Sequence, residues 1–244
     1  MRGIITIFKR ELVGYFSTPV AYVFLVIFLL VAGGFTWKLG GYYDANQADL
    51  APFFSWHPWV YLALIPALSM RLWAEERRSG TVELLMTLPI SAAQAVIGKF
   101  LAAWAFTGVA LALTATHWWT VNYLGDPDNG VIAASYIGSL LMAGAFIAVG
   151  SALSAITKNQ VIAFVLTFVV SLLFVLAGFP AVTDFFQGFA PAWLVDAIRN
   201  MSFLERFGAI TRGVIEARDA VFFLSVIALF LFFTTTTIEL KKAD

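Results

Sequence analysis

The sequence has 244 residues, no formal net charge and no cysteine, and 61% of its residues are hydrophobic whereas only 12% are charged. Its mean hydropathy of +0.86 excludes an ordinary soluble domain, for which about 45–50% apolar residues are typical. The absence of cysteine excludes disulfides, thiolate metal sites and a cysteine nucleophile. The composition therefore predicts one integral membrane domain over residues 1–244, with no nucleic-acid partner.

Residues 1–18 precede the first long apolar run and carry an amphipathic pattern. At roughly 100° per residue, Phe8 and Leu12 fall on one side of a helix and Arg10 falls on the opposite side. The segment ends at Thr18-Pro19, where proline disfavours a continuous helix. We predict an interfacial helix on the cytoplasmic leaflet. An extension of the first membrane span is the alternative.

Six apolar segments are long enough to cross a bilayer core, which requires about 20 residues. They are 19–41, 52–74, 97–124, 131–157, 160–181 and 219–239. The first is longer than the apolar core of a signal peptide, which spans about 7–15 residues, so we expect it to remain as a span. The predicted fold is all-α, a polytopic membrane protein with six transmembrane helices.

The basic residues indicate the orientation of these spans. If the termini are cytoplasmic, ten Lys and Arg residues lie on the cytoplasmic side and five lie on the other side. Cytoplasmic loops are normally the richer in Lys and Arg, and Trp and Tyr gather near the predicted outer ends of the spans. We therefore predict that both termini are cytoplasmic.

The connection between the second and third spans, residues 75–91, combines charges with a short apolar helix. Thr81 is a suitable N-cap, Glu83 favours the first turn and Pro89 ends the segment. The apolar residues of this helix are Val82, Leu84, Leu85, Met86 and Leu88. They surround most of a helix that is too short to cross a bilayer. We predict that it docks against another protein, with a helix lying on the lipid surface as the alternative.

The connection 182–218 between the fifth and sixth spans mixes aromatic and charged residues. Its notable residues, with the first acid of the last span, are Phe186, Trp193, Arg212, Arg218 and Asp219. Long connections without structure of their own are uncommon in compact domains. We predict short helices at the outer surface, which form a re-entrant pair if protein covers their ends.

Two stretches resemble a known family, the permease subunits of type-2 ATP-binding-cassette (ABC) transporters. The residues that match the coupling segment of this family are Glu75, Glu76, Gly80, Thr81, Glu83, Leu84, Leu85 and Pro89. A second stretch, "RFGAITRGVIEARDAVFFLS" from Arg206, is similar to the outer connection and last span of the gliding-motility-type subgroup. The resemblance implies six membrane helices, an interfacial helix before the first span and a coupling helix between spans two and three.

The resemblance implies a non-catalytic permease subunit of an ATP-driven exporter or cell-envelope system in the bacterial inner membrane. A separate ABC ATPase subunit would bind ATP and Mg, because the only Gly-Lys pair, Gly98-Lys99, is followed by Phe100 and makes no phosphate-binding loop. The residues expected to couple to that ATPase are Glu75, Glu76, Gly80, Thr81, Val82, Glu83, Leu85 and Met86. No catalytic, cofactor-binding or metal-binding residue is expected on this chain.

Further partners follow from the same resemblance. They are a second permease copy or a sister permease, an accessory membrane subunit with a large extracytoplasmic domain, and membrane lipid. The family places the contact between the two permeases at the first and fifth spans. A secondary carrier or a membrane scaffold without ATP coupling is the alternative function. A carrier is expected to hold ionisable groups at the bilayer centre, where this sequence has no obvious one. His57 and His117, beside tryptophans near the outer interface, are read as interfacial aromatics and not as catalysts.

Overall fold

The computed structural model describes residues 2–40, 42–43, 48–87, 89–188, 190–214 and 216–241, without the side chains of Arg2, Val20, Leu84 and Met86. All regular structure in these residues is helical, which confirms the all-α prediction. The elements are α1 (Arg2–Phe16), α2 (Pro19–Gly34), the π-helix η1 (Phe35–Leu39), α3 (Ala51–Ser55), α4 (His57–Ser69), α5 (Arg71–Ser79), α6 (Thr81–Thr87), α7 (Ala92–Leu113), α8 (Ala115–Leu124), α9 (Asn129–Ile156), α10 (Gln160–Leu176), α11 (Pro180–Gln187), α12 (Ala192–Asn200), α13 (Phe203–Ile210) and α14 (Ala217–Leu240).

Four stretches of the described chain are long and apolar enough to cross a membrane. They are Ala21–Leu39, Ala92–Leu124, Asn129–Ile156 and Ala217–Leu240. A fifth is added if α10 and α11, which are bent by 74° with respect to each other, form one broken span. The protein is therefore a multi-pass membrane protein with four to five candidate spans by this measure.

The predicted second span, 52–74, is not one continuous helix. It is divided into α3, α4 and α5 by breaks at Trp56 and Met70. Pro58 lies in the first turn of α4, and Pro66 lies inside that helix. A proline has no amide hydrogen to donate and its ring crowds the preceding turn, so it favours a new helix start or a break nearby. The apolar run is long enough, but its proline positions divide it.

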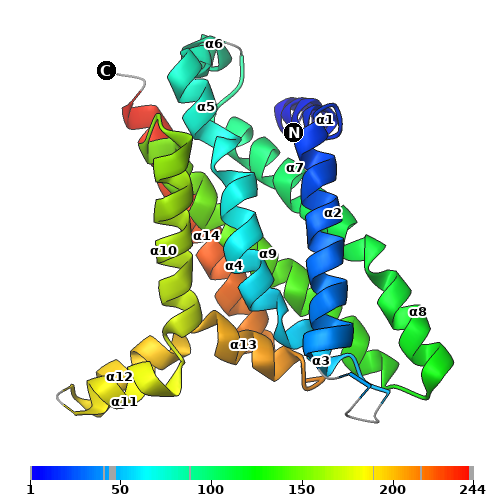
Figure 1. Ribbon diagram of the computed structural model, residues 1–244. Helices are drawn as coiled ribbons and strands as arrows, with labels where there is room; N and C mark the ends of the chain where they lie inside the picture. The colour runs from blue at the N-terminus through cyan, green and yellow to red at the C-terminus, as the bar shows by residue number, and fades with distance from the viewer. Residues whose placement is uncertain are drawn as a thin grey trace.

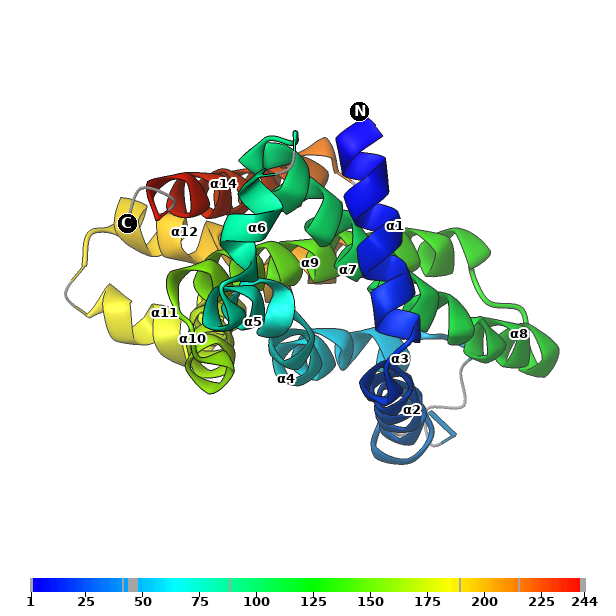
Figure 2. The same cartoon turned by 90° about the horizontal axis from the view of Figure 1, so that it is seen from above.

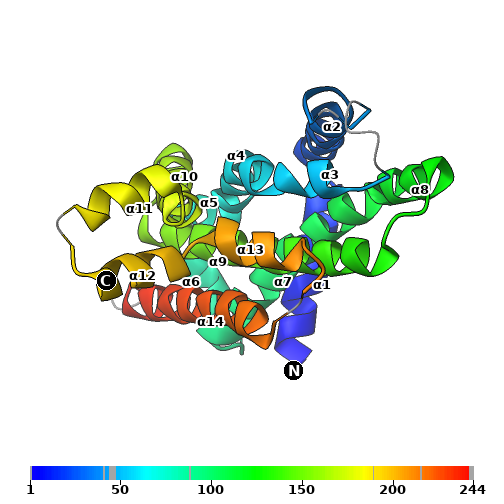
Figure 3. The ribbon, with the colours of Figure 1, turned by 90° about the horizontal axis from the view of Figure 1, so that it is seen from below.

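The helices form a bundle around α9, which lies between α4, α7, α10 and α14 (Figures 1 and 2). Helices α1 and α6 and the C-terminal end of α14 lie at one end of the bundle (Figure 1). Helices α3, α11, α12 and α13 lie at the opposite end, where α13 crosses the centre of the view from below (Figure 3). The start of α1 and the end of α14 are thus on the same side of the bundle (Figure 1).

Close contact between α9 and α4 depends on Gly150. A Cβ atom added there would collide with Ser69 Oγ and would lie 3.2 Å from Thr167 Cγ2. By contrast, a Cβ at Gly208 in α13 would meet no side chain or neighbouring backbone within 4 Å. Small residues on α9 therefore serve packing inside this chain.

Gly150→Ala is expected to lower the free energy of unfolding by about 1–3 kcal/mol, because the added methyl group forces α4 and α9 apart. Gly208→Ala is the matched control, and it should leave stability unchanged or raise it by about 1 kcal/mol through helix propensity. Thermal unfolding of both variants in detergent, followed by circular dichroism, measures the difference. Equal Tm values for the two variants would contradict the close-packing argument.

Candidate functional site

The break at Met70 is stabilised by a side chain from α9. The Ser154 hydroxyl accepts the amides of Trp73 and Ala74 at 3.1 and 3.0 Å, and it donates to the Met70 carbonyl at 2.8 Å. The first amides of a helix have no partner within that helix and require one from elsewhere. Ser154 therefore supplies the N-terminal cap that the sequence around α5 lacks, and it fixes where α5 begins.

Two further contacts hold α5 along α9. The fully buried indole of Trp73 donates through Nε1 to Ser151 Oγ at 3.1 Å. The guanidinium of Arg77 donates to the Ala155 carbonyl at 2.7 Å, at the C-terminal end of α9 where a cation is favourable. Helix α5 is thus attached to α9 from its first turn to its last.

Helix α5 ends at Ser79 and is followed by Gly80, which has a φ of +72°. This left-handed conformation is strained for residues with a Cβ, so glycine suits the position. The chain then turns directly into α6, and the Thr81 hydroxyl donates to the Glu76 carbonyl at 3.4 Å. Gly80 therefore sets the angle between the anchored α5 and the short α6.

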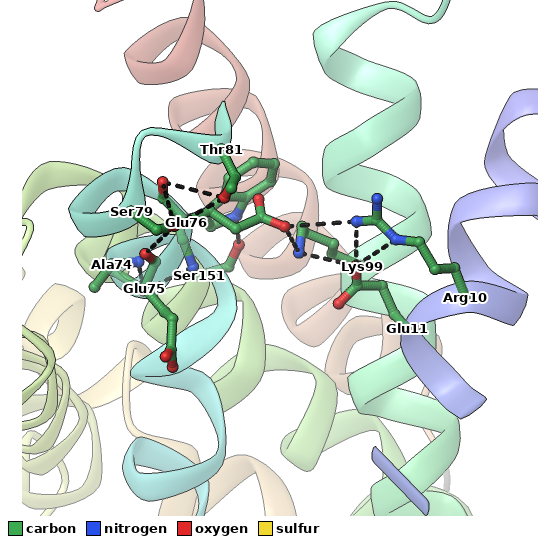
Figure 4. A network of polar contacts seen from close by, with 11 residues as sticks. Arg10, Glu11, Ala74, Glu75, Glu76, Ser79, Thr81, Lys99 and Ser151 are labelled. Atoms are coloured by element: carbon green, nitrogen blue, oxygen red, sulfur yellow. Dashed lines mark hydrogen bonds and ion pairs between the residues drawn. The ribbon is translucent and has the colours of Figure 1, made fainter. Parts of the chain in front are cut away.

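A cluster of four charged residues joins α5 to α1 and α7 (Figure 4). Lys99 Nζ on α7 lies 2.8 Å from Glu76 Oε1 on α5 and 3.1 Å from Glu11 Oε1 on α1. Arg10 pairs with the adjacent Glu11 and lies 3.5 Å from Glu76 Oε1. Three helices that are distant in sequence are therefore connected through one lysine.

Lys99 is only 3% exposed, and it lies over the ring of Trp73 at 5.3 Å from the centroid. A buried ammonium group requires acidic partners, since its desolvation is otherwise very costly. Burial raises the pKa of the Glu11 carboxyl, but the charges of Lys99 and Arg10 outweigh this effect and hold the pKa below its ordinary value. Glu76 Oε2 is buried and has no hydrogen-bond partner in the described part of the chain. The cluster is thus strongly coupled but incompletely satisfied.

The local sequence places Lys99 at this point. Helix α7 begins with a capping box, in which Ser91 Oγ accepts the Gln94 amide at 3.2 Å and Gln94 Oε1 accepts the Ser91 amide at 3.3 Å. Gly98, which has no Cβ, allows α1 to approach, because a Cβ there would lie 2.8 Å from Ile7. The close approach of α1 brings Glu11 within reach of Lys99.

The structure assigns internal partners to the two acids that were expected to face an ATPase. Glu76 belongs to the cluster around Lys99, and Glu75 Oε2 accepts the side-chain amide of Gln160 at 2.7 Å. Both acids therefore connect helices within this chain. Lys99 and Glu11 were missed as site residues, although a single lysine at the start of the apolar segment 97–124 was a usable signal.

The apolar residues of α6 also differ from the expected docking face. Leu85 is only 4% exposed, and Val82 is half-buried against the hydrophobic core. The side chain of Met86 lies outside the described residues. Thr81, Glu83 and Thr87 are exposed. Leu85 is thus an internal packing residue, and the accessible side of α6 is polar where its side chains are described.

Helix α1 carries the residues that predicted an amphipathic segment. Phe8 and Leu12 are half-buried, whereas Arg10 is 50% exposed. The helix lies across α7 near one end of the bundle (Figure 2). An apolar side directed toward the bundle and a charged side directed outward agree with the sequence pattern.

The residues expected in the outer connection fall into two groups. Asp219 is buried and pairs with Arg206 Nη1 at 3.1 Å, while Arg218 donates to Asn200 Oδ1 at 2.7 Å. Phe186 is half-buried, but Trp193 is 70% exposed and Arg212 is exposed. The structure therefore gives Arg218 and Asp219, at the start of α14, partners in Asn200 and Arg206, and it leaves Trp193 on the surface.

A comparison with curated proteins finds no match for this sequence. A family model described as ABC-2 family transporter protein matches residues 50–242, from α3 to the end of α14. The matched region includes α5, α6, Lys99 and the central helix α9, so it contains most of the site just described. Because the match covers more than half of the sequence, the chain belongs to the ABC-2 transporter family, and it is a membrane-embedded permease component of an ABC transporter.

Proposed function

We propose that this chain transmits ATP hydrolysis by a separate ATPase subunit to its own membrane helices, as part of an exporter or a cell-envelope system. The observation that carries the proposal is the buried Lys99 on α7, which joins α1 to α5, the helix that leads into α6. A force applied to α6 reaches α5 through Gly80 and through the hydrogen bond from Thr81 to the Glu76 carbonyl. The Lys99 cluster and the contacts of α5 with α9 then pass it to the bundle.

The proposed topology has six spans. The run α3–α4–α5 forms a broken second span, and α10 with α11 forms the fifth. In support, α3 and α6 lie at opposite ends of the bundle and α5 leads from α4 to α6 (Figure 1). The termini, α1 and α6 would then face the cytoplasm of a bacterial cell at its inner membrane, with α1 at the interface and α6 as the coupling helix.

The proposed partners are an ATPase that binds ATP and Mg, a second permease copy or sister permease, and an accessory membrane subunit with a large extracytoplasmic domain. Exposed apolar residues on α2 and α10 support a permease partner there. They are Val26, Leu30, Val165, Val169 and Leu173. The resemblance to the gliding-motility-type subgroup supports the accessory subunit. A secondary carrier or scaffold is the rival proposal.

Glu83→Arg tests the coupling role of α6. Glu83 is exposed, so reversal of its charge should leave the fold intact while it weakens association with the ATPase roughly tenfold, as expected for a charge at an interface. The measurement is co-purification of the ATPase encoded with this chain, together with its rate of ATP hydrolysis in the presence of the permease.

Glu239→Arg is the matched control, because Glu239 is also exposed and lies near the C-terminal end of α14. This variant should bind and stimulate the ATPase as the parent does. Equal behaviour of Glu83→Arg and Glu239→Arg would remove α6 from the coupling route. Failure of the parent chain to bind or stimulate the ATPase would favour the carrier or scaffold.

A further inference from the structure

A large groove lies between α1 and α2 on one side and α4 and α5 on the other. Its volume is about 740 Å³, within the range of roughly 300–1,000 Å³ that is usual for small-molecule sites. Its apolar wall is formed by Val23, Phe24, Ile27, Leu64 and Leu68. Such a surface suits a hydrocarbon chain.

Four residues that carry a formal charge also line the groove, and three of them have partners. Arg10 and Glu11 belong to the Lys99 cluster, and Glu75 accepts a hydrogen bond from Gln160. Arg71 is exposed and has no ion pair or hydrogen bond within the described part of the chain. The groove therefore combines an apolar wall with one uncompensated guanidinium group.

We propose that this groove binds an anionic lipid, with Arg71 holding the phosphate and an acyl chain lying along the apolar wall. Arginine presents parallel N–H donors that match two oxygens of a phosphate. A cation without an acidic partner in or beside the bilayer is unfavourable unless an anion or water reaches it. A lipid phosphate satisfies Arg71 and its chain covers the apolar wall at the same time.

Charge complementarity favours a lipid over a second copy of this chain. A copy related by a two-fold axis along the membrane normal would present its residues at the same depth. The acids nearest this level are Glu11, Glu75 and Glu76, and each is already bound within its own chain. The proposal depends on the membrane location of the chain and not on its coupling to an ATPase.

The test uses the full-length protein in nanodiscs of phosphatidylcholine that contain a minor fraction of phosphatidylglycerol. Native mass spectrometry after release from the nanodisc measures which lipid stays bound. The parent should retain phosphatidylglycerol preferentially, and Arg71→Gln should reduce this preference about tenfold, the loss expected for one charge-assisted contact. Arg78→Gln is the matched control, since Arg78 is exposed on the same helix but does not line the groove.

Gly14→Trp provides an independent variant that retains Arg71. Gly14 lines the groove and a Cβ there meets no side chain or neighbouring backbone within 4 Å, so the indole should occupy the groove and displace the lipid. Gel filtration and circular dichroism should show a folded protein of unchanged size for every variant. The proposal fails if Arg71→Gln keeps the preference of the parent for phosphatidylglycerol. It also fails if Arg71→Gln changes the oligomeric state instead, because the groove would then be an interface between copies of this chain. The proposal would also be overturned if soluble glycerol phosphate displaced the bound lipid while Gly14→Trp retained it, because the site would then bind free phosphate.

Discussion

Replacement of Lys99 by methionine is expected to lower the free energy of unfolding by about 3–5 kcal/mol, the range for removal of one partner of a buried ion pair. Methionine retains most of the apolar volume beside Trp73, but it removes the buried cation that Glu11 and Glu76 share and leaves only the half-exposed Arg10 near both carboxylates. Thermal unfolding in detergent measures the loss. Protection of α1 from proteolysis should fall with it, because Glu11 contributes to the attachment of that helix.

Two variants make this result specific. Arg10→Met removes a cation that is 50% exposed, so it should cost only about 0–1 kcal/mol. The triple variant Lys99→Met, Glu11→Gln, Glu76→Gln removes the repelling charges, and it should recover a large part of the lost stability. If Lys99→Met were as stable as Arg10→Met, Lys99 would not connect the three helices energetically, and the proposed route from α6 would lose its main support.

Arg206→Met is expected to have a similar effect at the opposite end of the bundle. Asp219 is 2% exposed, its Oδ1 binds Arg206 Nη1, and its Oδ2 has no hydrogen-bond partner among the described residues. Loss of Arg206 would leave a buried carboxylate uncompensated, at a cost of about 3–5 kcal/mol. Methionine preserves apolar contact with Phe222, over which the guanidinium now lies at 5.4 Å from the ring centroid.

The measurement is again thermal unfolding, with Arg212→Met as the control because Arg212 is exposed on the same side of the bundle. The control should change stability by less than about 0.5 kcal/mol, as is usual for surface substitutions. Addition of Asp219→Asn to Arg206→Met should restore much of the loss. A single variant Arg206→Met with the parent Tm would show that Asp219 is satisfied in another way.

Much of the fold could be predicted because long apolar runs with clear end signals are local properties. The segment predicted as 131–157 corresponds to α9, which is Asn129–Ile156, and its start is capped by the Asp128 carboxylate accepting the amides of Gly130 and Val131. The broken span could not be predicted from hydropathy alone. The partner that stabilises the break, Ser154, comes from a distant helix and has no signature near Met70.

The site could be predicted only in part, for a similar reason. Glu76 and Leu85 lie in a segment whose composition indicates a functional helix, but composition does not show which residues turn inward. Glu76 binds Lys99 and Leu85 joins the core, so both serve the chain internally. A lysine in an apolar segment indicates that an acid must lie nearby. Which acid it binds depends on how three helices pack.

The Ser154 contact has a consequence for the biosynthesis of the protein. The Trp73 amide and its acceptor hydroxyl are separated by 81 positions along the chain. At translation rates of about 5–20 residues per second, the ribosome reaches Ser154 roughly 4–16 seconds after it has made Trp73. During that interval the first turn of α5 has no cap from α9. Helix α5 therefore lacks this stabilising contact until α9 has been made, and a slowdown of translation between the two helices would prolong the exposure of α5 to quality-control proteases.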